Sequence, residues 1–114
     1  MTAGAERGRE PDSELVSIIM PTYNCGAFIG ETIASVQAQT HSHWELLVVD
    51  DCSTDDTAEV VAALAENDPR IHYVRLETNS GAAMARNRAM ELAQGRYMAF
   101  LDSDDLWHPD KLRR

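Results

Sequence analysis

Trp44-Glu-Leu-Leu-Val-Val-Asp-Asp51 is the stretch that decides the fold of this 114-residue chain. The uninterrupted apolar run at 46–49 predicts a strand over 44–49 that is covered on both faces, as strands of a parallel sheet are. Two carboxylates follow at once, Asp50 and Asp51, where the strand leaves the sheet. The segment therefore predicts a parallel sheet that carries acidic side chains at the carboxyl end of a strand.

The same alternation of strand and amphipathic helix continues on both sides of this segment. Further strands are predicted over 16–20, 71–76 and 97–101, and helices over 27–39, 53–68 and 82–93. This order, β-α-β-α-β-α-β, predicts an α/β fold with a parallel sheet, right-handed crossovers and helices on both faces.

Local patterns place the helix faces and ends. In the first helix, the apolar residues at helical spacing are Phe28, Ile29, Ile33 and Val36. In the second helix, the buried stripe is expected to be Val60, Val61, Leu64 and Ala65. Ser53 is expected to cap the second helix together with Asp56, and Gly95 to end the third.

Composition limits the class of protein. The chain is long enough for one domain, predicted over 15–114 after a disordered leader at 1–14, and its hydrophobic content of 44% is that of a globular protein. A net charge of −9 argues against nucleic-acid binding. The sequence has neither a signal peptide nor an apolar run long enough to cross a membrane, so a cytoplasmic location is expected.

An acidic cluster follows the last predicted strand. The apolar run 97–101 is expected to be a buried strand, and Asp102-Ser103-Asp104-Asp105 comes directly after it. Three adjacent carboxylates need positive charge, and a divalent cation with oxygen ligands supplies it. Because Asp102 and Asp104 lie on the same side of an extended chain, they predict a metal that holds a phosphorylated substrate.

Polar residues also follow the other predicted strands, and in parallel sheets ligands bind at the carboxyl ends of strands. No Lys or Arg lies between Glu10 and Pro69, so an anionic ligand must meet a metal or an arginine of the second half. Arg86 lies near a predicted helix N-terminus, where it can approach a phosphate. Simpler readings remain open at this point: Asp50 and Asp51 as a polar strand end, and Tyr23 as a rim aromatic.

Four segments together resemble family 2 glycosyltransferases. They are 16–24 (VSIIMPTYN), 46–55 (LLVVDDCSTD), 79–87 (NSGAAMARN) and 95–105 (GRYMAFLDSDD). The resemblance implies a GT-A fold, which is Rossmann-like, and a nucleotide-diphosphate-sugar donor. It also implies a divalent metal, Mn²⁺ or Mg²⁺, and an inverting displacement at the anomeric carbon of the sugar.

The resemblance also implies roles for individual residues. Pro21 and Tyr23 would line the nucleoside pocket, and Asp51 would contact the uracil of a UDP-sugar. The residues bordering the nucleotide and its phosphates would be Asn79, Gly81 and Arg86.

Residues 102–104 match the Asp-X-Asp motif of that family. Asp104 would be the direct metal ligand, and Asp102 would meet the ribose or a metal-bound water. Ser103 lies between them and would border the donor.

Members of the family continue for about another hundred residues beyond this motif, as a full core requires. The chain is therefore expected to be the truncated, donor-binding half of the transferase. It shows no motif for the catalytic base or for the acceptor, which would be a saccharide or another molecule. A homodimer is expected to cover the sheet edge left exposed.

Three alternatives differ in class. The first is a non-catalytic nucleotide-binding module. The second, a receiver-like signalling domain, needs a lone acceptor Asp after its third strand, where this chain has Glu77-Thr78. The third, an Asp-X-Asp phosphatase, needs its motif after the first strand.

Overall fold

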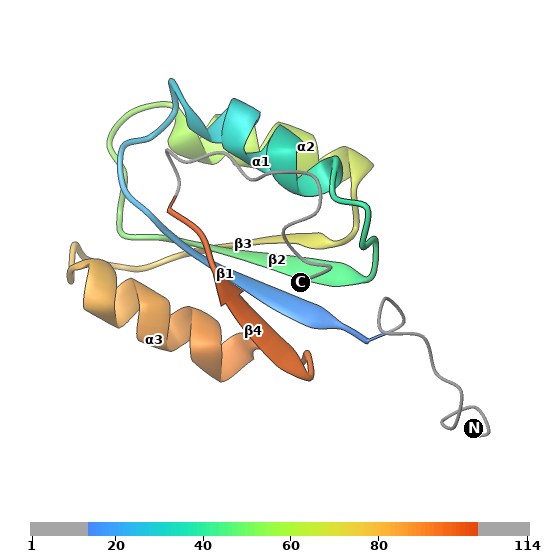
Figure 1. Ribbon diagram of the computed structural model, residues 1–114. Helices are drawn as coiled ribbons and strands as arrows, with labels where there is room; N and C mark the ends of the chain where they lie inside the picture. Colours follow the sequence, from blue (N-terminus) through green and yellow to red (C-terminus); the bar gives the residue numbers. More distant parts are fainter. Residues whose placement is uncertain (1–13, 103–114) are drawn as a thin grey trace.

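The computed structural model describes residues 14–102 and shows strands and helices in strict alternation (Figure 1). The elements are β1 (Val16–Thr22), α1 (Ile29–Gln37), β2 (Trp44–Asp50), α2 (Thr57–Asn67), β3 (Ile71–Arg75), α3 (Ala82–Leu92) and β4 (Tyr97–Phe100). The predicted order of elements is confirmed, with shifts at their ends. No helix within 14–102 has the length and apolar character needed to span a membrane.

The described strands form one parallel sheet in the order β3-β2-β1-β4. Helices α1 and α2 cover one face, and α3 covers the other (Figure 1). The chain moves outward from β1 to β2 and β3, then crosses to β4 on the opposite side of β1. Strand order therefore reverses at β1, and such a reversal marks where a parallel sheet binds ligands, outside its carboxyl ends.

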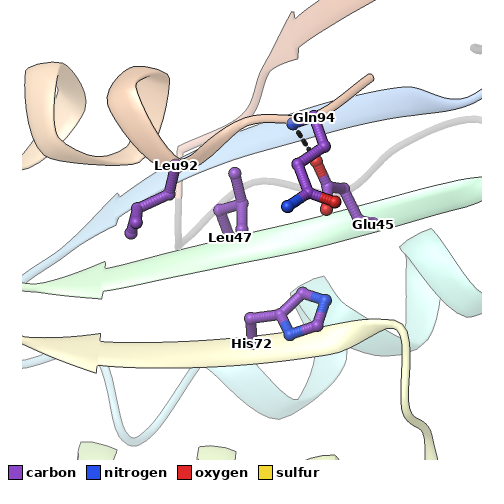
Figure 2. Close-up of a pocket in the computed structure, with 5 residues that line it drawn as sticks. All are labelled: Glu45, Leu47, His72, Leu92 and Gln94. Atoms are coloured by element: carbon purple, nitrogen blue, oxygen red, sulfur yellow. Dashed lines mark hydrogen bonds between the residues drawn. The ribbon is translucent and has the colours of Figure 1, made fainter.

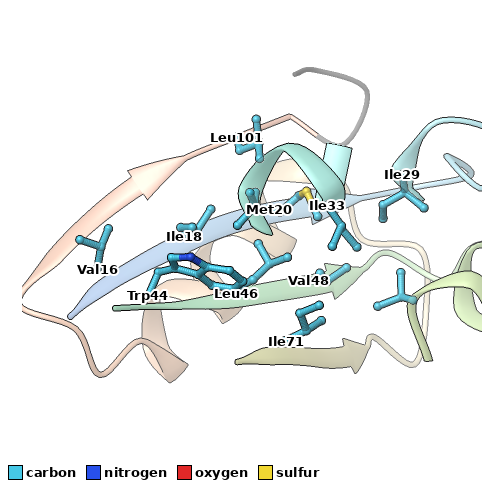
Figure 3. Packing of buried hydrophobic residues seen from close by; sticks show 12 residues of the cluster. Val16, Ile18, Met20, Ile29, Ile33, Trp44, Leu46, Val48, Ile71 and Leu101 are labelled. Carbon is cyan, nitrogen blue, oxygen red and sulfur yellow. The ribbon is translucent and has the colours of Figure 1, made fainter. Parts of the chain in front are cut away.

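Side chains that alternate along the strands make a core on each face of the sheet. Under α1 and α2, Ile18, Leu46 and Val48 are fully buried together with Ile33 of α1 (Figure 3). Under α3, the core is smaller and is built around Ile19, Leu47 and Val49, with Ala85 and Ala89. Because β2 is central, all of its residues are buried, as the apolar run at 46–49 predicts.

The prediction that 97–101 is a buried strand is wrong for most of its residues. Tyr97, Met98 and Phe100 are each about half exposed, and only Leu101 is buried. In the described chain β4 pairs with β1 alone, and α3 packs on β1 and β2 rather than over β4. Within residues 14–102 the outer edge of β4 has no partner strand, and the homodimer stays a prediction.

Three expectations about helix ends and faces are also wrong. Phe28 precedes α1 and is 57% exposed, so it does not belong to the buried face of that helix. Ser53 does not cap α2, because its hydroxyl bonds Asp50 and the helix begins only at Thr57. Gly95 lies beyond the end of α3 and is needed for a close approach to β1.

That approach is part of a buried network at the amino ends of the strands. The Ser17 hydroxyl donates to Glu45 Oε2, which also accepts the backbone N–H of Gln94 at 2.7 Å. The backbone N–H of Gly95 donates to Ser17 Oγ at 2.8 Å. The network ties the α3–β4 turn to β1 and β2 and satisfies a carboxylate that would otherwise be costly to bury.

We expect Gly95→Ala to lower the free energy of unfolding by about 2–3 kcal/mol, because the backbone beside Leu15 and Ser17 must shift to admit the methyl group. A Cβ at this position would lie 2.8 Å from the Leu15 carbonyl oxygen and 2.8 Å from the Ser17 nitrogen. The measurement is urea unfolding followed by circular dichroism.

The matched control is Gly30→Ala in α1, where a Cβ meets only Val60 at 4.0 Å. A helical site with free space is expected to gain up to about 1 kcal/mol from alanine. Equal stabilities for the two variants would contradict the packing described for Gly95.

Candidate donor-binding site

Two loops at the carboxyl edge of the sheet are bonded to each other. The β1–α1 loop contributes Asn24, whose backbone N–H donates to Ser53 Oγ (2.8 Å) and whose Oδ1 accepts the N–H of Thr54 (2.8 Å). Asn24 has a φ of 50°, a left-handed conformation that Asn tolerates better than most residues. These bonds fix the β2–α2 loop against the end of β1.

A second set of bonds continues this link toward α2. Asp55 Oδ2 accepts the N–H of Gly26 at 3.1 Å, and its Oδ1 accepts both the hydroxyl and the backbone N–H of Thr57. The Thr57 hydroxyl is the main cause that lowers the pKa of Asp55 from its ordinary value. Asp55, rather than Ser53, therefore bonds the first residue of α2.

Asp51 holds the loop that precedes α3. Its Oδ1 accepts the backbone N–H of Ser80 at 2.6 Å, and its Oδ2 accepts that of Gly81 at 2.8 Å. The side-chain amide of Asn79 donates to the Asp51 carbonyl oxygen at 3.2 Å. Gly81 has a φ of 98°, a conformation available to glycine without strain. Asp51 thus sets the position of the N-terminus of α3.

A small pocket of about 70 Å³ opens beside these bonds. It is lined by Pro21, Thr22 and Tyr23 from the end of β1, by Asp51, and by Ala82 and Ala85 of α3. Tyr23 is 47% exposed, so a face of its ring is open to a ligand. Five of the residues proposed from the sequence therefore meet at this pocket or bond directly to Asp51: Pro21, Tyr23, Asp51, Asn79 and Gly81.

Two more of the proposed residues, Arg86 and Asp102, lie away from the pocket. Arg86 is exposed on α3, and Asp102 is exposed just after β4; neither lines the pocket or has a hydrogen-bond or ion-pair partner within 14–102. Ser103 and Asp104, like Asp105, lie outside the described residues. Within the described chain no three His, Cys, Asp or Glu side chains gather as a metal cluster.

Other arginines of the second half are already engaged. Arg70 makes two hydrogen bonds to Asp68, each of 2.9 Å, and its guanidinium lies over the Trp44 ring; it holds the pKa of Asp68 well below its usual range. Arg88 pairs with Glu91 along α3, as expected of a solvated helix residue. Arg86 is thus a helix arginine still free for a phosphate in the described chain.

Asp50 is structural, although its neighbour Asp51 lines the pocket. It is fully buried, and its Oδ1 accepts both the N–H of Ser53 (2.9 Å) and the Ser53 hydroxyl (2.6 Å). Its Oδ2 accepts the Tyr73 hydroxyl and lies 3.6 Å from Arg75 Nη1. Burial, together with this hydrogen bond, raises the pKa of Tyr73 to about 12.

A larger pocket, of about 210 Å³, opens on the α3 face at the other end of the strands (Figure 2). It is lined by Glu45, Leu47, His72, Leu92 and Gln94. Glu45 is the buried carboxylate of the Ser17 network, so a structural role accounts for it. None of the residues proposed from the sequence lies here.

Sequence reasoning missed most of the residues that join the loops. The sequence predicts the start of a helix at Ser53, Asp55 and Thr57. It predicts ordinary strand residues at Tyr73 and Arg75. Their partners across the loops lie more than 20 positions away along the chain, so no local pattern identifies them. Asn24 gave the one available signal, because a polar residue that tolerates positive φ lies two positions beyond the end of the strand.

Comparison with protein families gives one match that covers most of the chain. The family described as "Glycosyl transferase family 2" matches residues 17–114. TuaG of Bacillus subtilis (strain 168), named as a candidate glycosyltransferase of teichuronic acid biosynthesis, is 57% identical over 100 residues, which are 88% of this chain and 40% of TuaG. WfgD of Escherichia coli, named as a UDP-Glc:alpha-D-GlcNAc-diphosphoundecaprenol beta-1,3-glucosyltransferase, is 52% identical and covers 89% of this chain and 39% of WfgD. The chain thus spans about 40% of the length of these relatives.

Solved structures share the fold. TarS 1-349 of S. aureus in complex with UDP superposes with a TM-score of 0.80 at 38% identity and covers 86% of this chain and 30% of its own. The mannosyltransferase PcManGT from Pyrobaculum calidifontis, in complex with GDP-Man and Mn²⁺, gives a TM-score of 0.76 at 34% identity, over 81% of this chain and 28% of its own. The fold is that of GT-A glycosyltransferases, as the sequence predicts.

Proposed function

The chain belongs to glycosyltransferase family 2, and from this premise we propose that it carries the donor site of an inverting glycosyltransferase. The proposed donor is a UDP-sugar, held with Mn²⁺ or Mg²⁺, and the acceptor is a saccharide or another molecule. One observation supports this above all: the pocket at the switch point of the sheet is built from Tyr23, Asp51 and the N-terminal turn of α3.

The base would lie in that pocket, against the open face of Tyr23. Each carboxylate oxygen of Asp51 accepts one backbone N–H of the 79–81 loop, and a carboxylate oxygen has capacity for a second bond. The imide N–H of uracil would use this remaining capacity. At about 70 Å³ the pocket is smaller than a nucleoside site, so it holds an edge of the base rather than the whole of it.

The diphosphate would extend from the pocket toward Asp102 and α3. The first turn of α3, which begins at Ala82, would present its backbone N–H groups and the positive end of the helix dipole. Arg86, without a partner in the described chain, would supply a guanidinium to a phosphate.

The described residues fit a metal that is shared with the substrate. Mg²⁺ and similar ions are bound by one or two carboxylates together with phosphate oxygens, rather than by a full set of protein ligands. Asp102 has an exposed carboxylate without a partner within 14–102, at the edge where the phosphates would lie. Asp102 and, from the sequence, Asp104 would hold the ion. It would neutralise the charge of the diphosphate leaving group as a Lewis acid.

The experiment is calorimetric titration of the chain with UDP, TDP and GDP, each with Mn²⁺ and with EDTA. We expect UDP to bind more tightly than GDP. We also expect Mn²⁺ to lower the Kd for UDP about tenfold or more, which is the change in affinity that the loss of one interaction at a metal site typically causes. Absence of nucleotide binding in the presence of Mn²⁺, or binding that is identical with EDTA, would reject the proposal.

A further inference from the structure

The loop between β2 and α2 is strained next to the proposed donor site. Cys52, which directly follows Asp51, has a φ of 67°, a left-handed conformation that residues with a Cβ adopt at a cost. Such a conformation persists only where the surrounding structure holds both ends of the turn. The direction of the Asp51 side chain therefore depends on what holds residues 50 and 53.

Residue 53 is held from three directions. Asp50 bonds its N–H and hydroxyl, and the N–H of Asn24 donates to its Oγ at 2.8 Å. Arg75 Nη2 donates to its carbonyl oxygen at 2.9 Å and lies 3.6 Å from the Cys52 sulfur. The loop is thus bonded to the β1–α1 loop through Asn24 and to β3 through Arg75.

Residue 50 is held by β3 as well. Asp50 is fully buried, so its carboxylate is stable only while hydrogen-bonded. Ser53 donates to Oδ1. Within residues 14–102, Oδ2 accepts one hydrogen bond, from the Tyr73 hydroxyl, and Arg75 Nη1 lies farther away at 3.6 Å. Because burial and Asp50 raise the pKa of Tyr73 to about 12, its hydroxyl stays a donor at neutral pH.

We propose that Tyr73, on the edge strand β3, is a positioning residue for the nucleotide: through Asp50 it holds the strained turn at Cys52 and thereby sets Asp51 in the pocket. Tyr73 does not line that pocket. The Tyr73 hydroxyl bonds the buried carboxylate of Asp50, and Asp50 in turn bonds Ser53 in the loop that carries Asp51. The inference rests on the proposed function, since it concerns the affinity of the same site.

The test is Tyr73→Phe, which removes one hydroxyl and keeps the ring that packs against the core under α1 and α2. We expect the Kd for UDP with Mn²⁺ to rise about five- to tenfold, because a hydrogen bond to a buried charged group is lost. The titration is made well below the melting temperature, where the variant is fully folded, so that a loss of stability alone leaves the Kd unchanged.

The matched control is Tyr97→Phe. Tyr97 is a half-exposed tyrosine of β4 whose hydroxyl has no hydrogen bond within 14–102. We expect it to bind UDP like the unaltered chain. Equal Kd values for Tyr73→Phe and Tyr97→Phe would overturn the positioning role and leave the proposed function standing.

A measurement without nucleotide separates the two hypotheses further. Amide hydrogen exchange by NMR is expected to speed up about fivefold or more at Cys52 and Ser53 in Tyr73→Phe, since the loop opens more often once an anchor is lost. If the unaltered chain binds no nucleotide, the proposed function fails, and faster exchange still supports the anchoring step. Unchanged exchange would overturn that step whether or not nucleotide binds.

Discussion

Asp51→Ala is expected to weaken UDP binding by about 30-fold or more and to lower the free energy of unfolding by about 2–3 kcal/mol. The carboxylate accepts backbone N–H groups from Ser80 and Gly81, and alanine leaves both without their acceptor. The loop before α3 then loses the side chain that holds it in place, and the pocket loses one of its lining side chains. A change of about 2 kcal/mol in binding corresponds to the stated change in Kd.

The control for this variant is Asp56→Asn. Asp56 belongs to the same β2–α2 loop and is exposed, and its side chain makes no capping hydrogen bond to α2. Its replacement is expected to change stability by less than about 0.5 kcal/mol and to leave the Kd for UDP unchanged. Calorimetry and urea unfolding measure both quantities. An Asp51→Ala variant that behaves like Asp56→Asn would refute the role assigned to Asp51.

The second large effect is expected from the double variant Asp102→Ala/Asp104→Ala. Asp102 is exposed and has no partner in the described chain, so its loss leaves the fold intact. We expect the gain of about tenfold or more that Mn²⁺ brings to UDP binding to disappear, because the ion loses its protein ligands. The quantity measured is the ratio of the Kd in EDTA to the Kd in Mn²⁺, which should fall to about one.

Glu77→Gln is the matched control for the acidic pair. Glu77 is an exposed carboxylate at the carboxyl end of β3, on the same edge of the sheet but away from β4. Its removal changes the charge of that edge and leaves the proposed metal ligands in place. If Glu77→Gln abolished the Mn²⁺ effect as well, general electrostatics would explain it, and the assignment to residues 102 and 104 would be wrong.

The order of elements was predictable because periodicity is a local property. The apolar run at 46–49 identified the central strand, and the structure buries all of β2. Strand order was less accessible, since the crossing from β3 to β4 on the far side of β1 depends on packing between distant segments. The same limit explains the error at 97–101: the strand is apolar, but in the described chain it pairs only with β1, and Phe100 stays about half exposed.

The candidate site was predictable where it depends on strand ends. Because parallel strands bring their carboxyl ends to one edge, Pro21, Tyr23 and Asp51 could be placed together from the order of elements. The bonding within the site was not predictable. That Asp51 accepts two N–H groups of the 79–81 loop follows from the path of the backbone, which no residue pattern specifies.

Asp50 and Asp51 show most directly what sequence reasoning leaves undecided. They are the same residue type and adjacent in the chain. Asp50 is nevertheless fully buried and accepts the Tyr73 hydroxyl, whereas Asp51 lines a pocket. Successive residues at a strand end point to opposite faces, so neighbours meet different surroundings. The simpler reading, a polar strand end, fits Asp50, and the functional reading is proposed for Asp51.

A crystal structure of the chain with UDP and Mn²⁺ tests the central claim most directly. The account predicts the uracil edge between Tyr23 and Asp51, and the diphosphate directed past the N-terminus of α3 toward Asp102. A nucleotide bound at the opposite end of the sheet, between Glu45 and His72, or a carboxyl edge that stays empty at saturating UDP, would contradict it.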